Sequence, residues 1–208
     1  MKIAIIGTGH IGGNIGQVLG SKGHQIIFGV RDPQSPKTQA ALDNVKNATV
    51  TSIAEAVASA QIIFLGVPWQ ARADALANAG DLTGKTLVDC TNRTSPGQPG
   101  LSSVEETAQL AKGAHVLKAF NSLAAETILN PHFGNAKATA FFVGDDADSK
   151  ATLKQLGEEI GFYMADLGGL SNGYLIDAMF QAWIALAMGQ KLGRRMAFHV
   201  VSSTDDTK

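Results

Sequence analysis

The chain has 208 residues, of which 45% are hydrophobic and 17% are charged, and this length suits one main domain with a small appendage. Seventeen Lys and Arg against eighteen Asp and Glu give a formal net charge of −1, so the charge balance provides no footprint for nucleic acid or an anionic membrane. The single cysteine, Cys90, argues against a disulfide framework and a cysteine-rich metal site, and no metal site is predicted.

Two apolar segments bear on the location of the protein in the cell. The run before Gly7 is too short for a secretory signal. The longest strongly apolar stretch, Tyr174 to Met188, is shorter than the roughly 20 residues of a bilayer span. We therefore expect a cytoplasmic protein without a membrane or nucleic-acid partner, whose partners are small molecules or other protein chains.

Short runs rich in Ile, Val and Phe alternate with segments of helical character as far as about residue 166. The runs predict strands at Lys2–Ile6, His24–Phe28, Ala48–Thr51, Gln61–Val67, Thr86–Cys90, His115–Phe120, Thr139–Val143 and Phe162–Ala165. The segments between them predict helices at Ile11–Ser21, Gln39–Asn44, Ile53–Ser59, Gln70–Ala79, Val104–Leu110 (capped by Ser103), Ala124–Leu129 and Ser149–Ile160. Continuously apolar strands suit a sheet covered on both faces, so the predicted fold class is α/β, a doubly wound, mostly parallel sheet.

The pattern changes after residue 166. From Ser171 to Leu192, apolar residues cover nearly the whole circumference of one long predicted helix, which is therefore expected to be buried on most of its sides. It is covered either by the sheet or by a second copy of itself, and its full apolar coverage favours the second copy. We therefore divide the chain into a sheet domain, residues 1–166, and a dimer-forming helical segment, residues 167–208. The last residues, SSTDDTK, are expected to be disordered.

The strongest local signal is a glycine-rich run directly after the first predicted strand. Gly7-Thr8-Gly9-His10-Ile11-Gly12 opens a predicted helix. In this context the glycines suit a tight turn, a close approach of the backbone to a pyrophosphate, and close packing of helix on strand. Because the free N–H groups of a first helical turn bind phosphate, we predict that these six residues, Gly7, Thr8, Gly9, His10, Ile11 and Gly12, hold the diphosphate of a dinucleotide.

The end of the second strand favours NADP over NAD. About 20 residues past the glycines, where an NAD-binding domain presents an acid to the ribose 2′-hydroxyl, the chain has Val30 and Arg31. A guanidinium at this place suits a 2′-phosphate and stacks on adenine, and Lys37 is near enough in sequence to add a second charge. The alternative is a surface arginine paired with Asp32. We predict that Val30, Arg31 and Lys37 line the site of NADP(H).

Residues that follow the later strands are candidates for the nicotinamide half, because an open parallel sheet binds its ligand beyond the carboxyl ends of its strands. These candidates are Val67, Pro68, Trp69, Asn92 and Asn121. Trp69 fits either stacking on a planar ring or capping the core.

Three further residues carry side chains with a chemical function. Lys118 and Asn121 fit either orienting a carboxamide or ring carbonyl or satisfying a strand end, and the second role is slightly favoured. Cys90 is expected to be a small buried strand residue. No catalytic residue is predicted, because hydride passing between two stacked rings needs positioning and exclusion of water more than a general acid.

Five segments together resemble a known family. GTGHIGGNIG, the GVR turn, VPW, HVLKAFNS and GGLSNGYLID before an apolar helix are similar to the NADP oxidoreductases dependent on coenzyme F420, and HVLKAFN also resembles the cytoplasmic reductase domain of the STEAP metalloreductases. The resemblance extends from Met1 to about Gly193. It implies an NADP-binding Rossmann domain over residues 1–166, a small C-terminal helical part, a homodimer, and hydride transfer between NADPH and a deazaflavin or flavin ring.

Carried over to this chain, the resemblance implies that the glycine turn holds the diphosphate, that Arg31 holds the 2′-phosphate, and that Val67–Trp69 flank the nicotinamide. Val30 stands where the family often has a hydroxyl residue, which implies one missing phosphate contact. In the closing helix motif, Asp177 replaces a glutamate and Tyr174 an arginine. These two changes are expected to alter the acceptor pocket.

The preferred function is an NADPH-dependent oxidoreductase, F420-dependent or a flavin reductase, with F420, FMN or FAD as the second substrate. A reductase of a small imine or keto compound on the same scaffold would need a proton donor, and only Lys118 obviously qualifies. A redox sensor that binds NADP(H) without turnover is the alternative from another class, because a fold does not determine a function.

Overall fold

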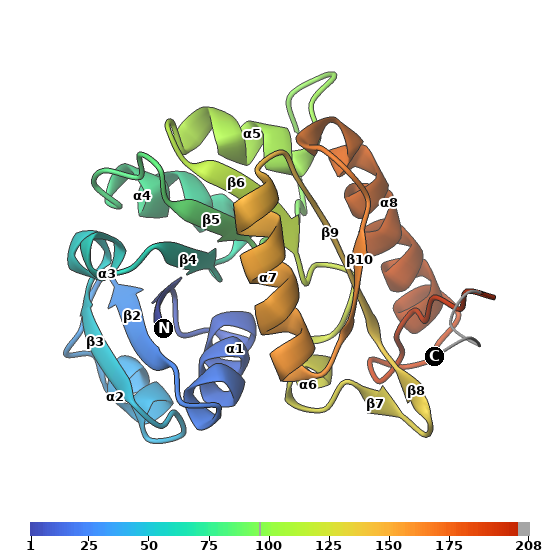
Figure 1. Ribbon diagram of the computed structural model, residues 1–208, viewed down its shortest axis with the longest axis horizontal. Helices are drawn as coiled ribbons and strands as arrows, with labels where there is room; N and C mark the ends of the chain where they lie inside the picture. The colour runs from blue at the N-terminus through green and yellow to red at the C-terminus, as the bar shows by residue number, and fades with distance from the viewer. Residues whose placement is uncertain (96, 204–208) are drawn as a thin grey trace.

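The computed structural model describes residues 1–95 and 97–203, without the side chain of Lys37. An eight-stranded sheet in the order β10-β9-β6-β5-β4-β1-β2-β3 forms the centre (Figure 1). Its strands are β1 Lys2–Ile6, β2 Gln25–Val30, β3 Ala48–Ser52, β4 Ile62–Leu65, β5 Thr86–Asp89, β6 His115–Ala119, β9 Thr139–Gly144 and β10 Tyr163–Asp166. Neighbours are parallel except β6 and β9, which are antiparallel. The predicted doubly wound, mostly parallel α/β class is confirmed, with all eight predicted strands in place.

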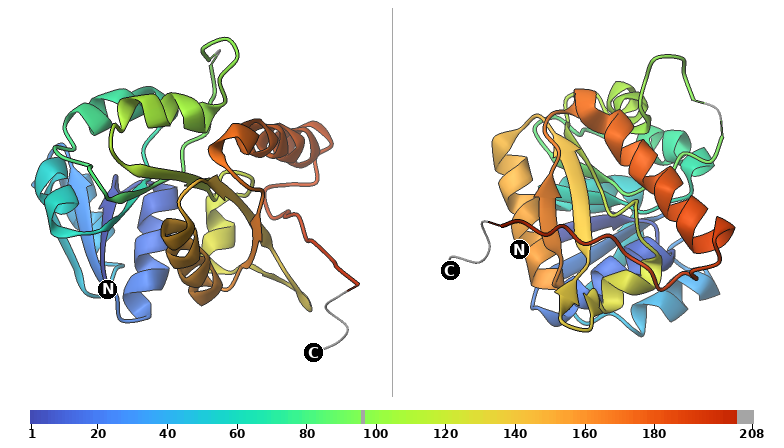
Figure 2. Two further views of the ribbon diagram at one scale, coloured as in Figure 1. Left: turned by 45° about the horizontal axis from the view of Figure 1, so that its top comes forward. Right: turned by 90° about the vertical axis from the view of Figure 1, so that its right-hand side faces the viewer.

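Helices cover both faces of the sheet. They are α1 His10–Ser21, α2 Pro36–Leu42, α3 Ile53–Ser59, α4 Arg72–Ala77, α5 Ser103–Leu110, α6 Ala125–Leu129, α7 Ala147–Ile160 and α8 Gly173–Ile184. Alternate residues of β1 explain the two layers, since Ile3 and Ile5 pack with α1 and α7 whereas Ala4 and Ile6 pack with α3, α4 and α5. Figure 2 shows α4 and α5 on one side of the sheet and α1 and α7 on the other.

Local signals placed most elements within a few residues, but one helix cap is shifted by one residue and one hairpin was missed. The cap of α5 is Ser102, not Ser103, because the Ser102 side chain accepts the Glu105 amide and the Glu105 carboxylate reaches back to Ser102. A hairpin of β7 His132–Phe133 and β8 Ala136–Lys137 was not predicted, since strands of two residues show no periodicity.

The C-terminal helix differs from expectation. It ends as α8 at Ile184 and continues only as a π-helical turn, Ala185–Gly189. Within one chain, three residues of α8 are buried, while Tyr174 and Met188 are 59% and 46% exposed. We expected this helix to be buried on most of its sides, and the sheet of one chain does not bury it to that extent. The domain division at residue 166 stays a prediction, and residues 204–208 of the expected disordered tail lie outside the described residues.

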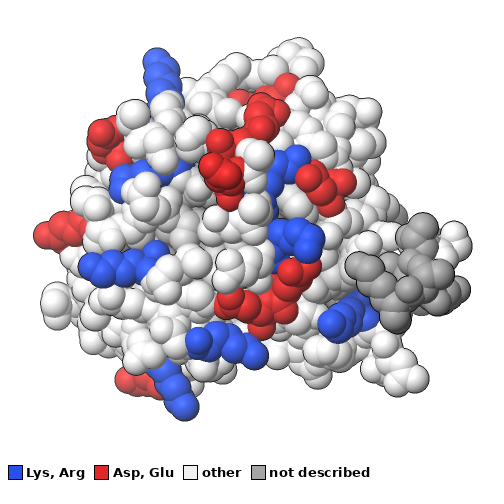
Figure 3. All heavy atoms as spheres, in the orientation of Figure 1, with Lys and Arg blue, Asp and Glu red and all other residues white. Residues whose placement is uncertain are grey.

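Two surface properties accompany this fold. On the face drawn in Figure 3, basic and acidic side chains are interspersed, in keeping with the small net charge. Across the described ranges, no helix combines the length and apolar character needed to cross a membrane.

A buried ion pair joins the middle of the sheet. The Nζ atom of Lys118 on β6 lies 3.1 Å from Oδ2 of Asp89 on β5 and donates to the Thr91 carbonyl at 2.7 Å, and both charged side chains are 0% exposed. The Asp89 carboxylate also accepts from the Thr107 hydroxyl of α5 and the Thr91 amide, each at 2.8 Å. Because both charges are fully paired in the interior, Lys118 is a structural residue, as the favoured interpretation held.

We expect Lys118→Met to lower the free energy of unfolding by about 3–5 kcal/mol, because it leaves the Asp89 carboxylate buried without its counter-charge. Urea titration followed by circular dichroism measures this change. The control is Lys154→Met, which removes a surface lysine paired with Glu158 in the same helix and should barely move the midpoint. Equal shifts in the two variants would contradict the buried-pair argument.

The close contact of α1 with β1 yields a second prediction. A Cβ added at Gly12 would lie 2.4 Å from the Gly7 carbonyl oxygen and 3.0 Å from Cγ2 of Ile5, whereas a Cβ at Gly13 meets nothing nearer than 3.6 Å. We expect Gly12→Ala to displace the helix and lower the thermal midpoint. Gly13→Ala should keep or raise the midpoint, because alanine favours a helix over glycine by up to ~1 kcal/mol. Differential scanning calorimetry on both variants decides the matter.

Candidate functional site

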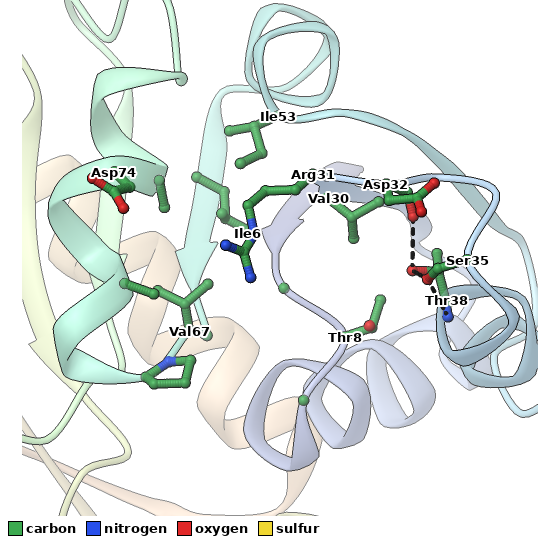
Figure 4. Close-up of a pocket in the computed structure, with 17 residues that line it drawn as sticks. Ile6, Thr8, Val30, Arg31, Asp32, Ser35, Thr38, Ile53, Val67 and Asp74 are labelled. Carbon is green, nitrogen blue, oxygen red and sulfur yellow. Dashed lines mark hydrogen bonds between the residues drawn. The ribbon is translucent and has the colours of Figure 1, made fainter.

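A cleft of about 330 Å³ lies at the carboxyl ends of β1, β2 and β4. The strand order reverses here, because β2 pairs with one side of β1 and β4 with the other. Open α/β sheets bind ligands at such a switch point. Figure 4 shows the glycine turn, the end of β2 and the start of α4 around one opening.

The glycine turn brings free backbone amides to this cleft. Gly7 has φ +100, and a Cβ there would lie 2.9 Å from the Gly66 carbonyl oxygen, so the turn requires glycine. The N-cap residue of α1 is Gly9, so no side chain of the cap accepts hydrogen bonds from the first-turn amides. The first turn also contains no acidic residue. The amides of this first turn have no partners within the helix, and the positive end of the helix dipole favours an anion beside them.

Among the predicted residues of this turn, Gly7, Thr8 and Gly9 line the cleft. His10 is exposed at the start of α1 and lines an adjoining hollow with Gln17 and Asn44, which shares Thr8 and Gly9 with the cleft. The Ile11 side chain packs against the core. Only its backbone amide can therefore make the predicted contact with a diphosphate.

Arg31 follows directly after β2, and Figure 4 shows its guanidinium reaching into the cleft toward Ile6 and Val67. The alternative pairing with Asp32 is not formed among the described side chains, and the Asp32 carboxylate instead accepts the Gln34 amide at 3.0 Å. Val30 lines the cleft beside it. The Lys37 side chain lies outside what the structure describes, so its predicted contact stays a prediction.

Two hydroxyl residues that sequence reasoning missed also line the cleft. Ser35 caps α2, its hydroxyl lying 2.8 Å from that of Thr38, and the Thr38 hydroxyl donates to the Asp32 carbonyl at 3.1 Å (Figure 4). In Figure 4 these two residues lie at the α2 end of the opening, whereas the Arg31 guanidinium extends toward Val67. They line the cleft even though Val30 removed the hydroxyl expected from the resemblance. The Ser35-Pro36 capping signal before Thr38 was available in the sequence.

The residues predicted for the nicotinamide half divide into two groups. Val67 and Pro68 line the cleft. Trp69 is only 6% exposed, and the Arg72 guanidinium stacks 3.3 Å from its ring centroid. Of the two roles considered for Trp69, the structure therefore favours capping the core, with one ring face already covered by a cation.

Asn92 and Asn121 lie beyond β5 and β6 and do not line the cleft beside the glycine turn. Asn121 is 1% exposed, and its Nδ2 donates to the Ile176 carbonyl of α8 at 3.2 Å. The side-chain oxygens of both asparagines are buried without a partner in the described part of the chain. Phe120 has φ +61, a strained value for a bulky residue. Cofactor contacts from the two asparagines remain predictions.

An ion cluster lies beside these strand ends. Glu106 of α5 accepts from Arg72 at 2.8 Å and from Arg93 at 2.9 Å, and Arg93 also reaches Asp177 of α8 at 3.3 Å. Burial raises the pKa of Glu106, but hydrogen bonds from the Gln98 amide and the arginines lower it further, so the net pKa lies below its usual value. We call Arg72, Arg93, Glu106 and Asp177 the ion cluster.

Asp177 was expected to affect the acceptor pocket, but its side chain joins two helices. Its carboxylate accepts the Ser103 amide at 2.8 Å and the Ser103 hydroxyl, and so joins α8 to the first turn of α5. The carboxylate is committed to these groups and to Arg93. Its effect on an acceptor pocket is thus indirect, through the position of α8.

The remaining reactive groups are few. Cys90 is buried, and burial raises the pKa of its thiol, so the thiol stays protonated as a strand residue. No group of three or more His, Cys, Asp or Glu side chains suited to a metal ion occurs within residues 1–95 and 97–203.

Comparisons with known proteins agree with this arrangement. Residues 2–93 match the family model described as NADP oxidoreductase coenzyme F420-dependent. The chain is 29% identical to the metalloreductase STEAP3 of Rattus norvegicus over 86% of its own length, but it spans only 36% of that protein. It is 28% identical to the F420-dependent NADP reductase of Methanothermobacter thermautotrophicus, over 85% of each chain.

A solved structure extends the likeness to nearly the whole chain. The protein from Arthrobacter sp. FB24 assigned as an F420-dependent NADP reductase superposes with a TM-score of 0.84 and 26% identity, over 97% of this chain and 100% of that one. The Rossmann-type architecture is therefore shared beyond the residues that the family model matches. The predicted resemblance is confirmed, and residues 2–93 carry the match to the model of the NADP oxidoreductases dependent on coenzyme F420.

Proposed function

We propose that this protein is an NADP-dependent oxidoreductase that transfers a hydride between NADP(H) and the ring of a deazaflavin, such as F420, or of a flavin. The family of residues 2–93 and the relatives named NADP reductases support NADP-dependent oxidoreduction. The observation that carries the choice of cofactor is the Arg31 guanidinium in the same cleft as the glycine turn. We also propose that it acts in the cytoplasm.

The chain's own groups suit each part of the dinucleotide. The first-turn amides of α1 would hold the diphosphate. Arg31 would hold the 2′-phosphate. Val67 and Pro68 would pack against the nicotinamide side and keep water away. When bound, NADPH supplies two electrons and a proton as hydride to the acceptor ring, which takes a second proton from solvent.

The surroundings of Lys118 argue against one of the two alternative functions and leave the other open. A reductase of small imines or keto compounds needed Lys118 as its proton donor, but that ammonium is fully buried against Asp89. A sensor that binds NADP(H) without turnover has the same cleft. Stopped-flow absorbance at 340 nm with F420, FMN and FAD separates the two remaining functions: oxidation of NADPH supports the reductase, and tight binding without oxidation supports the sensor.

Arg31→Ala should raise the Kd for NADPH by ~10- to 100-fold, because a charge-assisted hydrogen bond contributes about 1.5–3 kcal/mol. The Kd for NADH should change little, since NADH has no 2′-phosphate. Calorimetric titration measures both constants. Arg195→Ala is the control, because that arginine binds the Asn130 and His132 carbonyls at the β7–β8 hairpin. Equal losses for NADPH and NADH would place the 2′-phosphate elsewhere.

We further propose a homodimer through the outer side of α8. Its support is apolar surface left open by one chain: Tyr174, Met188 and Leu192 are 59%, 46% and 60% exposed, on or just beyond a helix rich in large apolar residues. Symmetric pairing of the same patch would cover these side chains.

Met188→Glu should convert the dimer to monomer, because a carboxylate in an apolar interface loses its hydration. Sedimentation velocity measures the mass. Leu129→Glu is the matched control, since Leu129 is also 46% exposed but lies on α6. A monomeric wild-type protein, or a dimer that survives Met188→Glu and dissociates with Leu129→Glu, would refute this interface.

A further inference from the structure

The phosphates of the proposed cofactor bring more negative charge than the described side chains of the cleft balance. A dinucleotide diphosphate carries about two negative charges near neutral pH, and a 2′-phosphate adds about two more. Among the described side chains that line the cleft, Arg31 is the one cation, and Asp32 and Asp74 are acidic. The glycine turn supplies backbone amides, which attract an anion through partial charges only. A further positive charge beside the turn would therefore strengthen binding.

His10 is the residue of the glycine turn whose side chain can carry such a charge. It follows Gly9 directly as the first residue of α1 and is exposed. Its side chain lines a hollow of about 250 Å³ together with Asn14 and Gln17 of the same helix. This hollow adjoins the cleft, because Thr8 and Gly9 line both. A diphosphate held by the first-turn amides would therefore lie beside the His10 imidazole.

The charged groups near His10 come from α6 and from the C-terminal segment. Glu126 of α6 accepts from Nε and Nη2 of Arg194 at 3.0 and 3.1 Å. Hydrogen bonds from Arg194 and from its own backbone amide hold the pKa of Glu126 below its usual range, and the nearby His10 lowers it further. Because a guanidinium already pairs with this carboxylate, Glu126 offers an imidazolium little net attraction. Beside α2 and the segment after it, the hollow is lined by uncharged residues, Ala41, Asn44 and Val45.

A bound diphosphate would change this balance. The amino end of a helix has positive partial charge, which disfavours a cation in the first turn of α1 while the site is empty of an anion. A diphosphate places negative charge beside the same ring, and an opposite charge nearby favours the protonated form of a histidine. Histidine is the side chain that ordinarily changes its charge between about pH 5 and 8. The effect on binding should therefore fall within the physiological pH range.

We propose that the His10 side chain binds the cofactor diphosphate as an imidazolium, so that binding of NADP(H) takes up a proton from solvent and becomes tighter as the pH falls. This inference rests on the proposed function and deepens it, because it names how pH regulates the same site. The sign follows from linkage, since a ligand that prefers the protonated form of a protein binds more tightly at lower pH.

The first test compares wild type with His10→Asn, which keeps a hydrogen-bonding side chain but cannot become charged. Calorimetric titration measures the Kd for NADP⁺ at pH 6.0 and at pH 8.5. The 2′-phosphate also titrates in this range, and the comparison with the variant cancels its contribution. We expect the ratio of the Kd at pH 8.5 to the Kd at pH 6.0 to be about fivefold to tenfold larger in wild type. Equal ratios in the two proteins would overturn the proposal.

Proton uptake can be measured directly. The binding enthalpy at pH 7.0 is determined in PIPES and in imidazole buffer, and because the two buffers differ in heat of ionisation, the difference gives the protons taken up. Wild type should take up roughly half a proton more than His10→Asn. The matched control is His199→Asn, which removes an exposed histidine bound to the Lys137 carbonyl and should behave as wild type. A control that loses as much proton uptake as His10→Asn would contradict the proposal.

A shorter ligand tests which phosphate His10 binds. 2′-AMP carries the phosphate expected at Arg31 but has no diphosphate. Its Kd should therefore show the same pH dependence in wild type and in His10→Asn. An effect of His10→Asn as large with 2′-AMP as with NADP⁺ would exclude the diphosphate as the partner of His10.

Binding and turnover are read separately, so this inference and the proposed function fail separately. Binding of NADP⁺ without a pH effect that depends on His10 contradicts the inference alone. Proton-linked binding without oxidation of NADPH by F420, FMN or FAD supports the inference and contradicts hydride transfer. Absence of NADP⁺ binding at either pH contradicts both.

Discussion

The contact on which the site depends is the one between β1, α1 and β4, and it is made almost entirely by glycines. Gly7 and Gly66 lie so close that a Cβ on Gly7 would meet the Gly66 carbonyl oxygen at 2.9 Å, and a Cβ on Gly66 would lie 3.0 Å from Cα of Gly12. This close approach places the amino end of α1 at the switch point of the sheet. An anion can then reach unpaired amides that side chains would otherwise cover.

The carboxyl edge of the sheet is held as one unit by buried polar contacts. The Asp89–Lys118 pair joins β5 to β6. The ion cluster continues outward, from Arg72 stacked on Trp69 to Asp177 on α8. Because buried charges are costly unless fully paired, these contacts tie the strand ends, α5 and α8 together. A cofactor and an acceptor bound on this edge would meet a preformed surface, which hydride transfer requires.

Most of the fold follows from local patterns. Continuous apolar runs marked all eight strands of the sheet, and the glycine run between a strand and a helix marked the turn that lines the cleft. The position of Arg31 in that cleft also followed from its distance in sequence to the glycines. These features could be predicted from the sequence because turn geometry and strand burial depend on neighbouring residues. Ser35 and Thr38 were missed, although their capping signal lies close to Arg31.

The residue types along the chain were enough to establish a parallel α/β sheet with a phosphate-binding turn, because periodicity and glycine placement act over short distances. They left open which polar residues face a ligand. Lys118, Trp69 and Asp177 each had a plausible functional role by position, and each is instead occupied by a partner 29, 3 or 74 residues away: Asp89, Arg72 and Ser103. Arg72 covers Trp69 locally, from three residues away. Lys118 and Asp177 are withdrawn from ligand binding by partners on distant segments, which only the packing of the folded chain brings to them.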